Sequence, residues 1–289
     1  LKMDLYLAAL FQGLGYAALG LGIYISLRIF NIPDITTDGS YTFGGAITAW
    51  GLIAGVHPMT VLLLAISGGA VAGIATGVIH TRLKVQSLLA GILVMTALYS
   101  INLGVMGRSN VPVNQAKNIF DLLPEEFVPY GVQMLFPLFI LVLVMALNYV
   151  LKSDFGIAMR ATGNSEQMVR AMGVNTRNMK ILGLALANGL TALSGFMMVQ
   201  YQGFADINMG IGIVISGLAA VMIGQSAGRL FRSNRIVLQL LLVVVGSILF
   251  RMILAVALDL GFNPNYLKLI TALMVLVVLL LTRFRRTEP

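Results

Sequence analysis

The side chains that could do chemistry in this chain are few and stand apart from one another. There are no cysteines, and the two histidines, His57 and His80, lie in no His, Asp and Glu group with metal-ligand spacing. No nucleophile–base pair or paired carboxylate falls within the apolar stretches, and the phosphate-binding pattern G-x-x-x-x-G-K-[ST] is missing. The sequence therefore predicts no catalytic centre, no metal and no cofactor, and no ATP hydrolysis by this chain itself.

Polar residues do collect at the starts of two short, glycine-rich apolar segments, 41–56 and 208–224. One interpretation is that their carboxylates cap helix N-termini. The other is that these broken elements line a pathway, where the N-termini of short helices hold an anionic group of a solute. Both can hold, because capping fixes the helix that would line the cavity. The expected pathway residues are Asp34, Thr36, Asp38, Ser40, Asp206 and Asn208.

Composition indicates a membrane protein. Hydrophobic residues make up 58% of the 289 residues, charged residues 10%, and the mean hydropathy is +0.91, whereas soluble domains carry roughly 25% charge. We expect an all-α, polytopic transmembrane bundle of about eight to ten membrane segments in one domain, 1–289, because helices satisfy their own backbone in lipid. Besides the two short segments, the apolar runs are roughly 5–27, 59–79, 86–106, 132–151, 181–200, 236–257 and 265–282.

Basic residues lie between alternate apolar runs and account for the net charge of +8, so we interpret them as a topology signal and not as a nucleic-acid site. By the positive-inside rule we expect the loop 152–180 and the C-terminus in the cytoplasm. The basic clusters are Arg82 with Lys84, Lys152 with the segment that follows it, Arg229 with Arg232 and Arg235, and Arg283 with Arg285 and Arg286; the acidic residues of the opposite loops are Asp121, Glu125, Glu126, Asp206 and Asp259.

The orientation of the N-terminus depends on the segment 41–56. If this segment crosses the membrane, the N-terminus lies outside; if it is broken or re-entrant, the N-terminus lies inside with Lys2. We expect the second arrangement, because the segment is short and follows the polar run PDITTDGS. Irregular backbone at membrane depth is tolerated where it is buried in protein or lines a cavity.

The longest polar stretch, GIAMRATGNSEQMVRAMGVNTRNMK at 156–180, has the signals of a short helix. Asn164 or Ser165 is a candidate N-cap, and Gln167, three residues after Asn164, resembles the second half of a capping box. Gly173 has the place of a glycine just past a helix C-terminus. We expect a capped helix of about two turns on the cytoplasmic surface.

The expected helix has two faces. Met168, Val169 and Met172 fall on one face, and Glu166 and Arg170 form an i,i+4 pair on another. A basic loop that only sets the topology remains one interpretation of this stretch. The other is a rigid helix that presents Met168 and Met172 to a partner outside the bilayer.

A resemblance to a known family rests on two stretches. ABC importer permeases of the branched-chain amino acid and ribose type have a coupling loop and following helix similar to GIAMRATGNSEQMVRAMGVNTRNMKILGLALANGLTALSGFM, and a segment similar to IPDITTDGSYTFGGAITA. The second stretch is closest to a subgroup that works with binding proteins of the aromatic amino acid type. The likeness runs from about residue 10 to residue 285. The matching residues are Gly156, Arg160, Ala161, Gly163, Asn164, Ala171, Gly173 and Gly195, with Asp34, Thr36, Asp38, Gly39, Ser40, Gly44, Gly45 and Ala46.

The resemblance implies that 164–173 is a coupling helix seated in a groove of a cytoplasmic ABC ATPase dimer. The chain would then be a non-catalytic membrane subunit, with ATP hydrolysed by the separate ATPase. The residues that the resemblance and the helix pattern together assign to ATPase coupling are Arg160, Gly163, Asn164, Glu166, Gln167, Met168, Arg170, Met172 and Gly173.

The implied function is import of a small solute, such as an amino acid or related compound, delivered by a periplasmic or lipoprotein binding protein. We expect a multi-pass protein of the bacterial inner membrane that pairs with a second copy of itself, while a pair of different permeases stays open. A secondary transporter or channel is the alternative, but it would need intramembrane charge, and Arg251, towards the outer end of its span, is the one such residue. A membrane-embedded enzyme is the other alternative.

Overall fold

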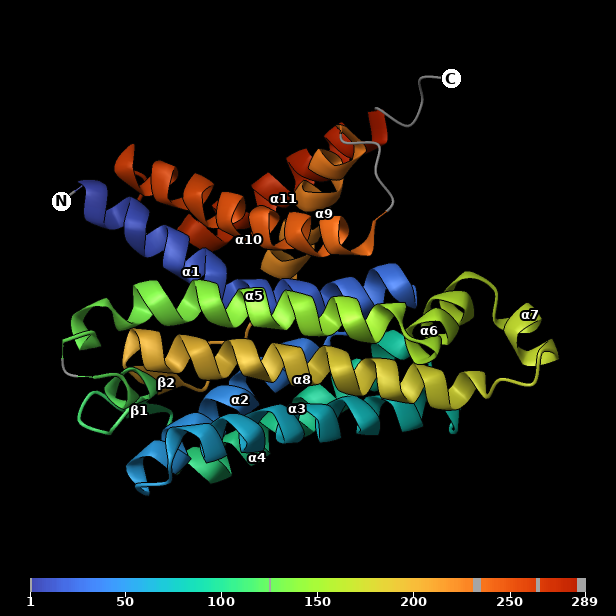
Figure 1. The fold of residues 1–289 in the computed structure, drawn as a ribbon, viewed down its shortest axis with the longest axis horizontal. Helices are drawn as coiled ribbons and strands as arrows, with labels where there is room; N and C mark the ends of the chain where they lie inside the picture. The colour runs from blue at the N-terminus through green and yellow to red at the C-terminus, as the bar shows by residue number, and fades with distance from the viewer. Residues whose placement is uncertain (1, 125, 231–234, 264–265, 285–289) are drawn as a thin grey trace.

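The computed structural model describes residues 2–124, 126–230, 235–263 and 266–284 (Figure 1). The expected all-α, polytopic bundle is confirmed: among the described residues, six helices are long and apolar enough to cross a membrane, and two further apolar helices are shorter. The helices are α1 (Lys2–Ile23), α2 (Thr36–Ile53), α3 (Pro58–Thr81), α4 (Ser87–Met106), α5 (Gly131–Lys152), α6 (Asp154–Asn164), α7 (Glu166–Ala171), α8 (Thr176–Gln202), α9 (Ile213–Leu230), α10 (Ile236–Asp259) and α11 (Leu267–Phe284).

Short elements join these helices. A π-helix, η1 (Tyr24–Ile29), extends α1, and two 3-10 turns, η2 (Ile119–Leu122) and η3 (Val128–Tyr130), precede α5. Strands β1 (Asn110–Pro112) and β2 (Phe204–Asp206) pair antiparallel, with Asn110 opposite Asp206. Glu125, Arg232, Arg285 and Arg286, which entered the topology prediction, lie outside the described residues.

The core of the bundle is built on α8, which packs against α1, α2 and α3. Over the most apolar 18 residues of each helix, 83% of α8 is buried, against 28% of α4 and 28% of α5. Small residues let the neighbouring backbones approach: a Cβ on Gly44 would lie 2.0 Å from the Ala192 carbonyl oxygen, and one on Gly73 would lie 2.2 Å from that of Leu184. Close packing of this kind stabilises helix pairs in lipid, where burial of apolar surface does not.

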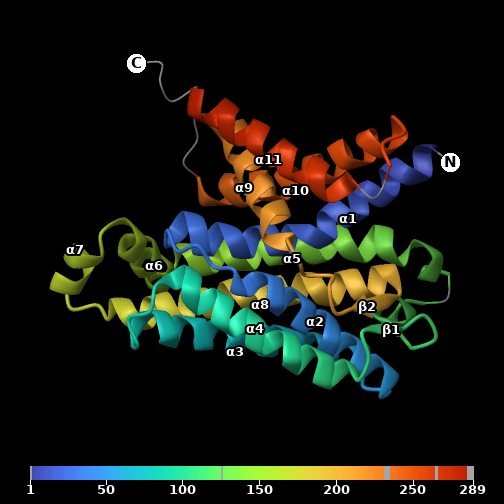
Figure 2. The same cartoon turned by 180° about the vertical axis from the view of Figure 1, so that it is seen from behind.

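The remaining helices form a second group. α10 packs against α1 and α9, and α11 packs against α9. Figure 2 shows α9, α10 and α11 on one side of α1, with α2, α3, α4 and α8 on its other side. The helix α1 therefore lies between the two groups and connects them.

The two ends of the molecule differ. The helices α6 and α7 lie at one end, and the paired strands lie at the other (Figures 1 and 2). The first turn of α1 lies at the strand end, and α1 runs from there toward the end that holds α7. The polar stretch 156–180 and the start of α1 are therefore at opposite ends of the chain's long axis.

The expected break near 41–56 is absent, whereas the expectation of a re-entrant segment stays a prediction, because the helix by itself does not fix its position in a membrane. Residues 36–53 form one unbroken helix, α2, which runs back toward the strand end (Figure 2). Its polar start does not break the helix because the hydroxyls bond within the chain: the Thr42 hydroxyl donates to the Asp38 carbonyl, and that of Thr48 to the Gly44 carbonyl. Polar side chains satisfied in this way need no water.

Candidate functional site

A buried polar network surrounds the start of α2. The Asp34 carboxylate accepts from the Thr36 backbone N–H at 2.9 Å and from the Asn188 amide at 2.7 Å, and the Ser40 hydroxyl donates to the Asn188 carbonyl oxygen at 2.7 Å. The hydroxyls of Thr36 and Thr76 lie 2.7 Å apart. Asp34 is 4% exposed, and Thr36, Ser40 and Asn188 are fully buried. The network joins the first turn of α2 to α8 and α3 and satisfies its members from within the chain.

Asp38 joins α2 to a helix far along the sequence. Its two carboxylate oxygens accept from the backbone N–H groups of Gly212 at 2.9 Å and Val214 at 3.0 Å, at the start of α9. A carboxylate at a helix N-terminus satisfies unpaired N–H groups and opposes the positive end of the helix dipole. The two short segments of the sequence therefore meet at one side chain, and Asp38 holds the first turns of α2 and α9 side by side.

Asp206 and Asn208 lie apart from this network. The second short helix begins at Ile213, so Asp206 is not its cap as expected. Instead, Asp206 ends β2 and accepts from the backbone N–H of Asn208 at 2.8 Å and from the Asn110 amide at 3.2 Å. The Asn110 contact ties the two strands together, and the Asn208 contact closes a local turn after β2. Of the expected pathway residues, the structure thus brings together Asp34, Thr36, Asp38 and Ser40 around α2, and it leaves Asp206 and Asn208 at the strand end.

The sequence did not predict that an arginine stacks on a pair of aromatic rings. The Arg251 guanidinium carbon lies 3.7 Å from the centroid of the Tyr16 ring, which stacks on the Tyr41 ring at 5.9 Å. The buried Nε of Arg251 has no hydrogen-bond partner among the described residues. The signal for this stack was Arg251 itself, since an arginine inside an apolar span requires a partner such as an aromatic face.

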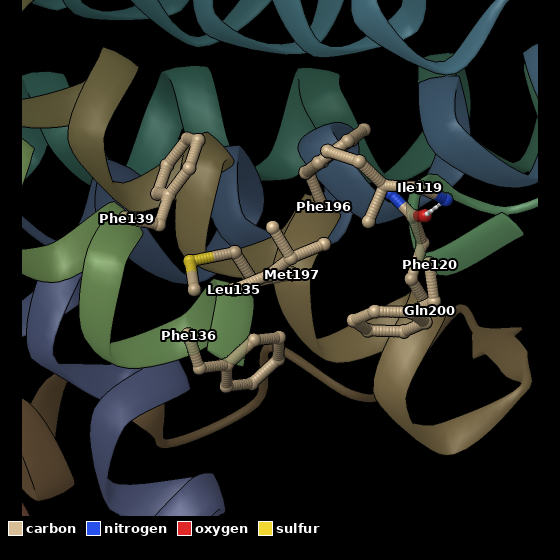
Figure 3. Close-up of a pocket in the computed structure, with 8 residues that line it drawn as sticks. All are labelled: Ile119, Phe120, Leu135, Phe136, Phe139, Phe196, Met197 and Gln200. Atoms are coloured by element: carbon tan, nitrogen blue, oxygen red, sulfur yellow. Dashed lines mark hydrogen bonds between the residues drawn. The ribbon is translucent and has the colours of Figure 1, made fainter. Parts of the chain in front are cut away.

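A small pocket lies between η2, α5 and α8 (Figure 3). Its volume of about 20 Å³ is close to that of a single water molecule, so it has no room for an amino acid. The Gln200 side chain at its edge accepts from the Ile119 backbone N–H at 2.6 Å. The residues that line it are Ile119, Phe120, Leu135, Phe136, Phe139, Phe196, Met197 and Gln200.

The polar stretch 156–180 contains most of α6, all of α7 and the start of α8, where the sequence predicted one short helix. α6 continues through Asn164, and the Ser165 side chain makes no capping bond to α7, so the predicted capping box is wrong. The physical reason is that Asn164 already has a helical backbone and cannot serve as the residue before a helix. α7 begins at Glu166, and Gly173, at φ +85, terminates the turn after it as expected.

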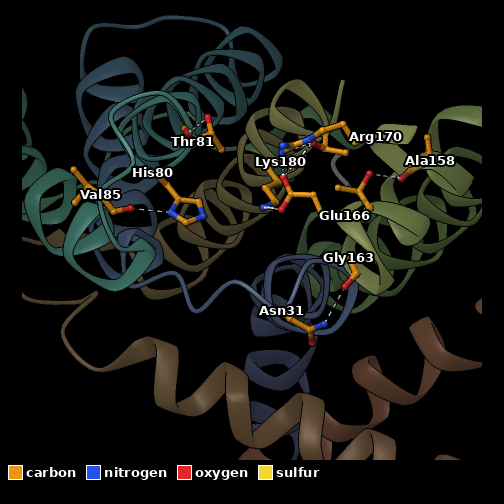
Figure 4. Close-up of polar contacts among 12 residues, drawn as sticks. Asn31, His80, Thr81, Val85, Ala158, Gly163, Glu166, Arg170 and Lys180 are labelled. Atoms are coloured by element: carbon orange, nitrogen blue, oxygen red, sulfur yellow. Dashed lines mark hydrogen bonds and ion pairs between the residues drawn. The ribbon is translucent and has the colours of Figure 1, made fainter. Parts of the chain in front are cut away.

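Glu166 fastens α7 to the start of α8 (Figure 4). Its carboxylate accepts from Arg170 at 2.7 Å, from the Thr176 hydroxyl at 3.1 Å and from Lys180 at 2.5 Å. These donors hold the pKa of Glu166 below its ordinary value, with the Lys180 hydrogen bond as the largest cause. Two of the three donors, Thr176 and Lys180, belong to α8, so α7 is attached to the most buried of the candidate spans.

The face of α7 opposite Glu166 is exposed. Met168 is 63% exposed and Met172 is 61% exposed, whereas Val169 between them is 2% exposed and packs inward. Gln167 is exposed as well. The helix therefore offers two flexible apolar side chains at the end of the molecule, of a kind that adapts to a partner surface.

α6 contacts the end of η1. A Cβ on Gly163 would lie 1.6 Å from the Ile29 carbonyl oxygen, and the Asn31 amide donates to the Gly163 carbonyl at 3.3 Å (Figure 4). Arg160 is exposed and its Nε donates weakly, at 3.4 Å, to the Gly156 carbonyl of its own helix. Residues 154–173 thus touch the ends of both α1–η1 and α8, which are the two most buried spans.

Comparison with known proteins decides the family. Residues 5–280 match the family described as "Branched-chain amino acid transport system / permease component". The chain belongs to this permease family. The permease is 38% identical over 268 residues to the tyrosine transport system permease protein of Clostridioides difficile (strain R20291), across 93% of this chain and 88% of that relative. It is 28% identical over 271 residues to the galactofuranose transporter permease protein of Escherichia coli (strain K12), across 91% and 75%.

Solved structures share the fold of this permease. The chain aligns with PsaBC from Streptococcus pneumoniae in complex with Fab at a TM-score of 0.52 and 15% identity, covering 96% of this chain and 90% of that one. A metal-chelate type ABC transporter in an inward-facing conformation aligns at a TM-score of 0.51 and 16% identity, covering 98% and 85%. The expectation of an ABC transporter permease is confirmed over a secondary transporter or channel, and this protein is a multi-pass component of a bacterial inner membrane.

Proposed function

We propose that this permease imports an amino acid, of the aromatic type, in a complex with a separate ABC ATPase dimer. The relative that carries 38% identity is named as a tyrosine transport permease, which supports this class of solute. The local sequence IPDITTDGSYTFGGAITA points the same way, through its similarity to permeases that work with aromatic amino acid binding proteins. In this proposal the chain forms the pathway and hydrolyses no ATP.

The observation that carries the proposal is the pair of exposed methionines on an anchored helix. α7 is held on α8 by the Glu166 carboxylate, so a force on α7 is transmitted to the core and not absorbed by a flexible loop. Met168 and Met172 would fill a groove of the ATPase, and α6 would pass the motion to the end of η1 through Gly163. The other proposed coupling residues, Arg160, Asn164, Gln167, Arg170 and Gly173, surround this contact.

Replacement of the two methionines tests this contact. We expect Met168→Ser with Met172→Ser to weaken association with the ATPase roughly 30-fold or more, because burial of each side chain contributes about 1.5–3 kcal/mol when complete. Leu83→Ser is the matched control, since Leu83 is 67% exposed and lies between α3 and α4. Co-purification and solute-stimulated ATPase activity are the measurements. Equal association of both variants would refute the contact.

The orientation follows from the same contact. We propose that the α7 end of the molecule is cytoplasmic. The positive-inside rule supports this orientation, because the segment 152–180 is basic and α11 ends with the basic Arg283. The start of α1 then lies outside, which replaces the expected cytoplasmic N-terminus. The paired strands β1 and β2 would face the periplasmic or lipoprotein binding protein, with Asp206 and Asn208 at that surface. An accessible tag placed before α1 in right-side-out vesicles tests the orientation.

Within a single chain the polar residues at the start of α2 are buried and do not line an open channel. We therefore further propose that two copies of the chain enclose the pathway between them. Asp34, Thr36, Asp38 and Ser40 would hold α2 and α9 where these helices face the solute. Since the sequence has no cysteine, single cysteines at Thr36 and Ser40 provide a clean test. They should react with a polar thiol reagent in at least one nucleotide state of the complex. Inertness in every state would remove them from the pathway.

A further inference from the structure

An open cleft of about 780 Å³ lies between the end of α5, α6 and the start of α10. Three basic and four aliphatic side chains line it. Among the described residues, no carboxylate lines the cleft. Of the residues that line the cleft, Arg160 alone also belongs to the proposed ATPase-coupling set. The residues that line it are Lys152, Arg160, Arg235, Ile236, Val237, Leu238 and Leu241.

The cleft straddles the expected membrane boundary. Lys152 is the last residue of the span Gly131–Lys152, and Arg235 directly precedes the span Ile236–Asp259. The aliphatic side chains belong to the first two turns of that second span, and Leu241 is 40% exposed. The cationic part of the cleft is therefore at the level of lipid headgroups, and its apolar wall is at the level of acyl chains.

The cations come from elements that are held in place. The Tyr24 hydroxyl donates to the Gln239 side chain at 2.5 Å, which ties η1 to α10. Arg28 of η1, four residues after Tyr24, is a further exposed cation. Lys152 of α5 and Arg160 of α6 thus line the cleft together, and η1, which carries Arg28, packs against α6.

We propose that this cleft binds an anionic phospholipid, with the phosphate against Lys152 and Arg160 and an acyl chain along Leu238 and Leu241. Basic pockets between membrane helices on the cytoplasmic side suit such headgroups. The apolar wall favours a lipid over a free phosphate or nucleotide, which would leave it uncovered. The proposal goes beyond transport, and only the assignment of the cleft to the inner leaflet depends on the orientation proposed above.

Lipid binding by the purified, delipidated chain in neutral detergent tests the proposal. Native mass spectrometry would titrate phosphatidylglycerol against phosphatidylcholine. We expect phosphatidylglycerol to bind at least about tenfold more tightly, and Lys152→Gln with Arg160→Gln to weaken it roughly 30-fold, since each basic residue contributes about fivefold near an anionic headgroup. Phosphatidylcholine binding should stay unchanged, which shows that the double variant is folded.

Two matched controls sharpen the result. Arg82→Gln with Lys84→Gln removes two exposed cations between α3 and α4, which do not line the cleft, and should change phosphatidylglycerol binding less than about twofold. Leu241→Ser should weaken binding, whereas Leu249→Ser, equally exposed two turns further along α10, should not. Equal binding of the two lipids, equal loss in the cleft and control variants, or displacement of the lipid by equimolar inorganic phosphate would each overturn the proposal.

Discussion

Removal of the Asp38 carboxylate is the most informative single change in the membrane part of the chain. Asp38→Ala leaves the N–H groups of Gly212 and Val214 without their acceptor at the start of α9. Asp38 is 8% exposed, so water does not readily replace it. Asp38→Asn has nearly the same volume and keeps one acceptor oxygen, which makes it the graded intermediate.

The expected cost follows from these two hydrogen bonds. A hydrogen bond to a charged group contributes about 1.5–3 kcal/mol, and loss of a helix cap costs about 0.5–2 kcal/mol in measured cases. Because the two estimates describe the same contacts, we expect Asp38→Ala to lower the free energy of unfolding by about 2–4 kcal/mol and Asp38→Asn by about half of that. Reversible unfolding in mixed micelles is the measurement, with solute uptake by the reconstituted complex beside it.

Asp206→Ala is the matched control for this change. Asp206 also accepts two hydrogen bonds, one of them from a backbone N–H, but it is half-buried at the strand end. We expect a cost of about 1 kcal/mol or less there, since water can replace the lost acceptor. If Asp38→Ala and Asp206→Ala cost the same, the carboxylate of Asp38 does not hold α2 and α9 together.

Further predictions concern the coupling segment. The pKa of Glu166 lies below its ordinary value, so its contribution to the attachment of α7 is present above about pH 4.5 and is lost as the pH falls through the lowered value. A spin label on Met172→Cys should therefore become mobile over that pH range. In a protein that also carries Glu166→Gln, the label should be mobile at every pH. Gly163→Ala forces a Cβ against the Ile29 carbonyl and should weaken ATPase coupling strongly in a hydrolysis assay. Gly173→Ala meets no atom within 4 Å, so its cost should be the backbone strain alone, about 1 kcal/mol, measured as a small loss of stability.

Much of the fold followed from local patterns. The membrane class, the number of segments and the place of the polar stretch depend on hydropathy and charge, which act within each span wherever the span packs. The exposed methionines of α7 and the terminating Gly173 were predicted for the same reason. The prediction of a capping box was wrong, because either Asn164 or Ser165 could mark the start of a helix by its residue type. In the structure α6, which contacts η1, continues through Asn164.

The partners of the polar residues were decided by the tertiary structure. The sequence indicated that Asp34 and Asp38 could cap helices, but Asp38 caps α9 at Gly212, 174 positions along the chain, and the Asn188 that binds Asp34 is 154 positions away. A carboxylate can accept from any N–H group that comes within reach, so its type does not specify its partner. The choice depends on how closely α2 approaches α8 and α9, and that distance is set by glycines such as Gly44 against backbone from distant parts of the chain.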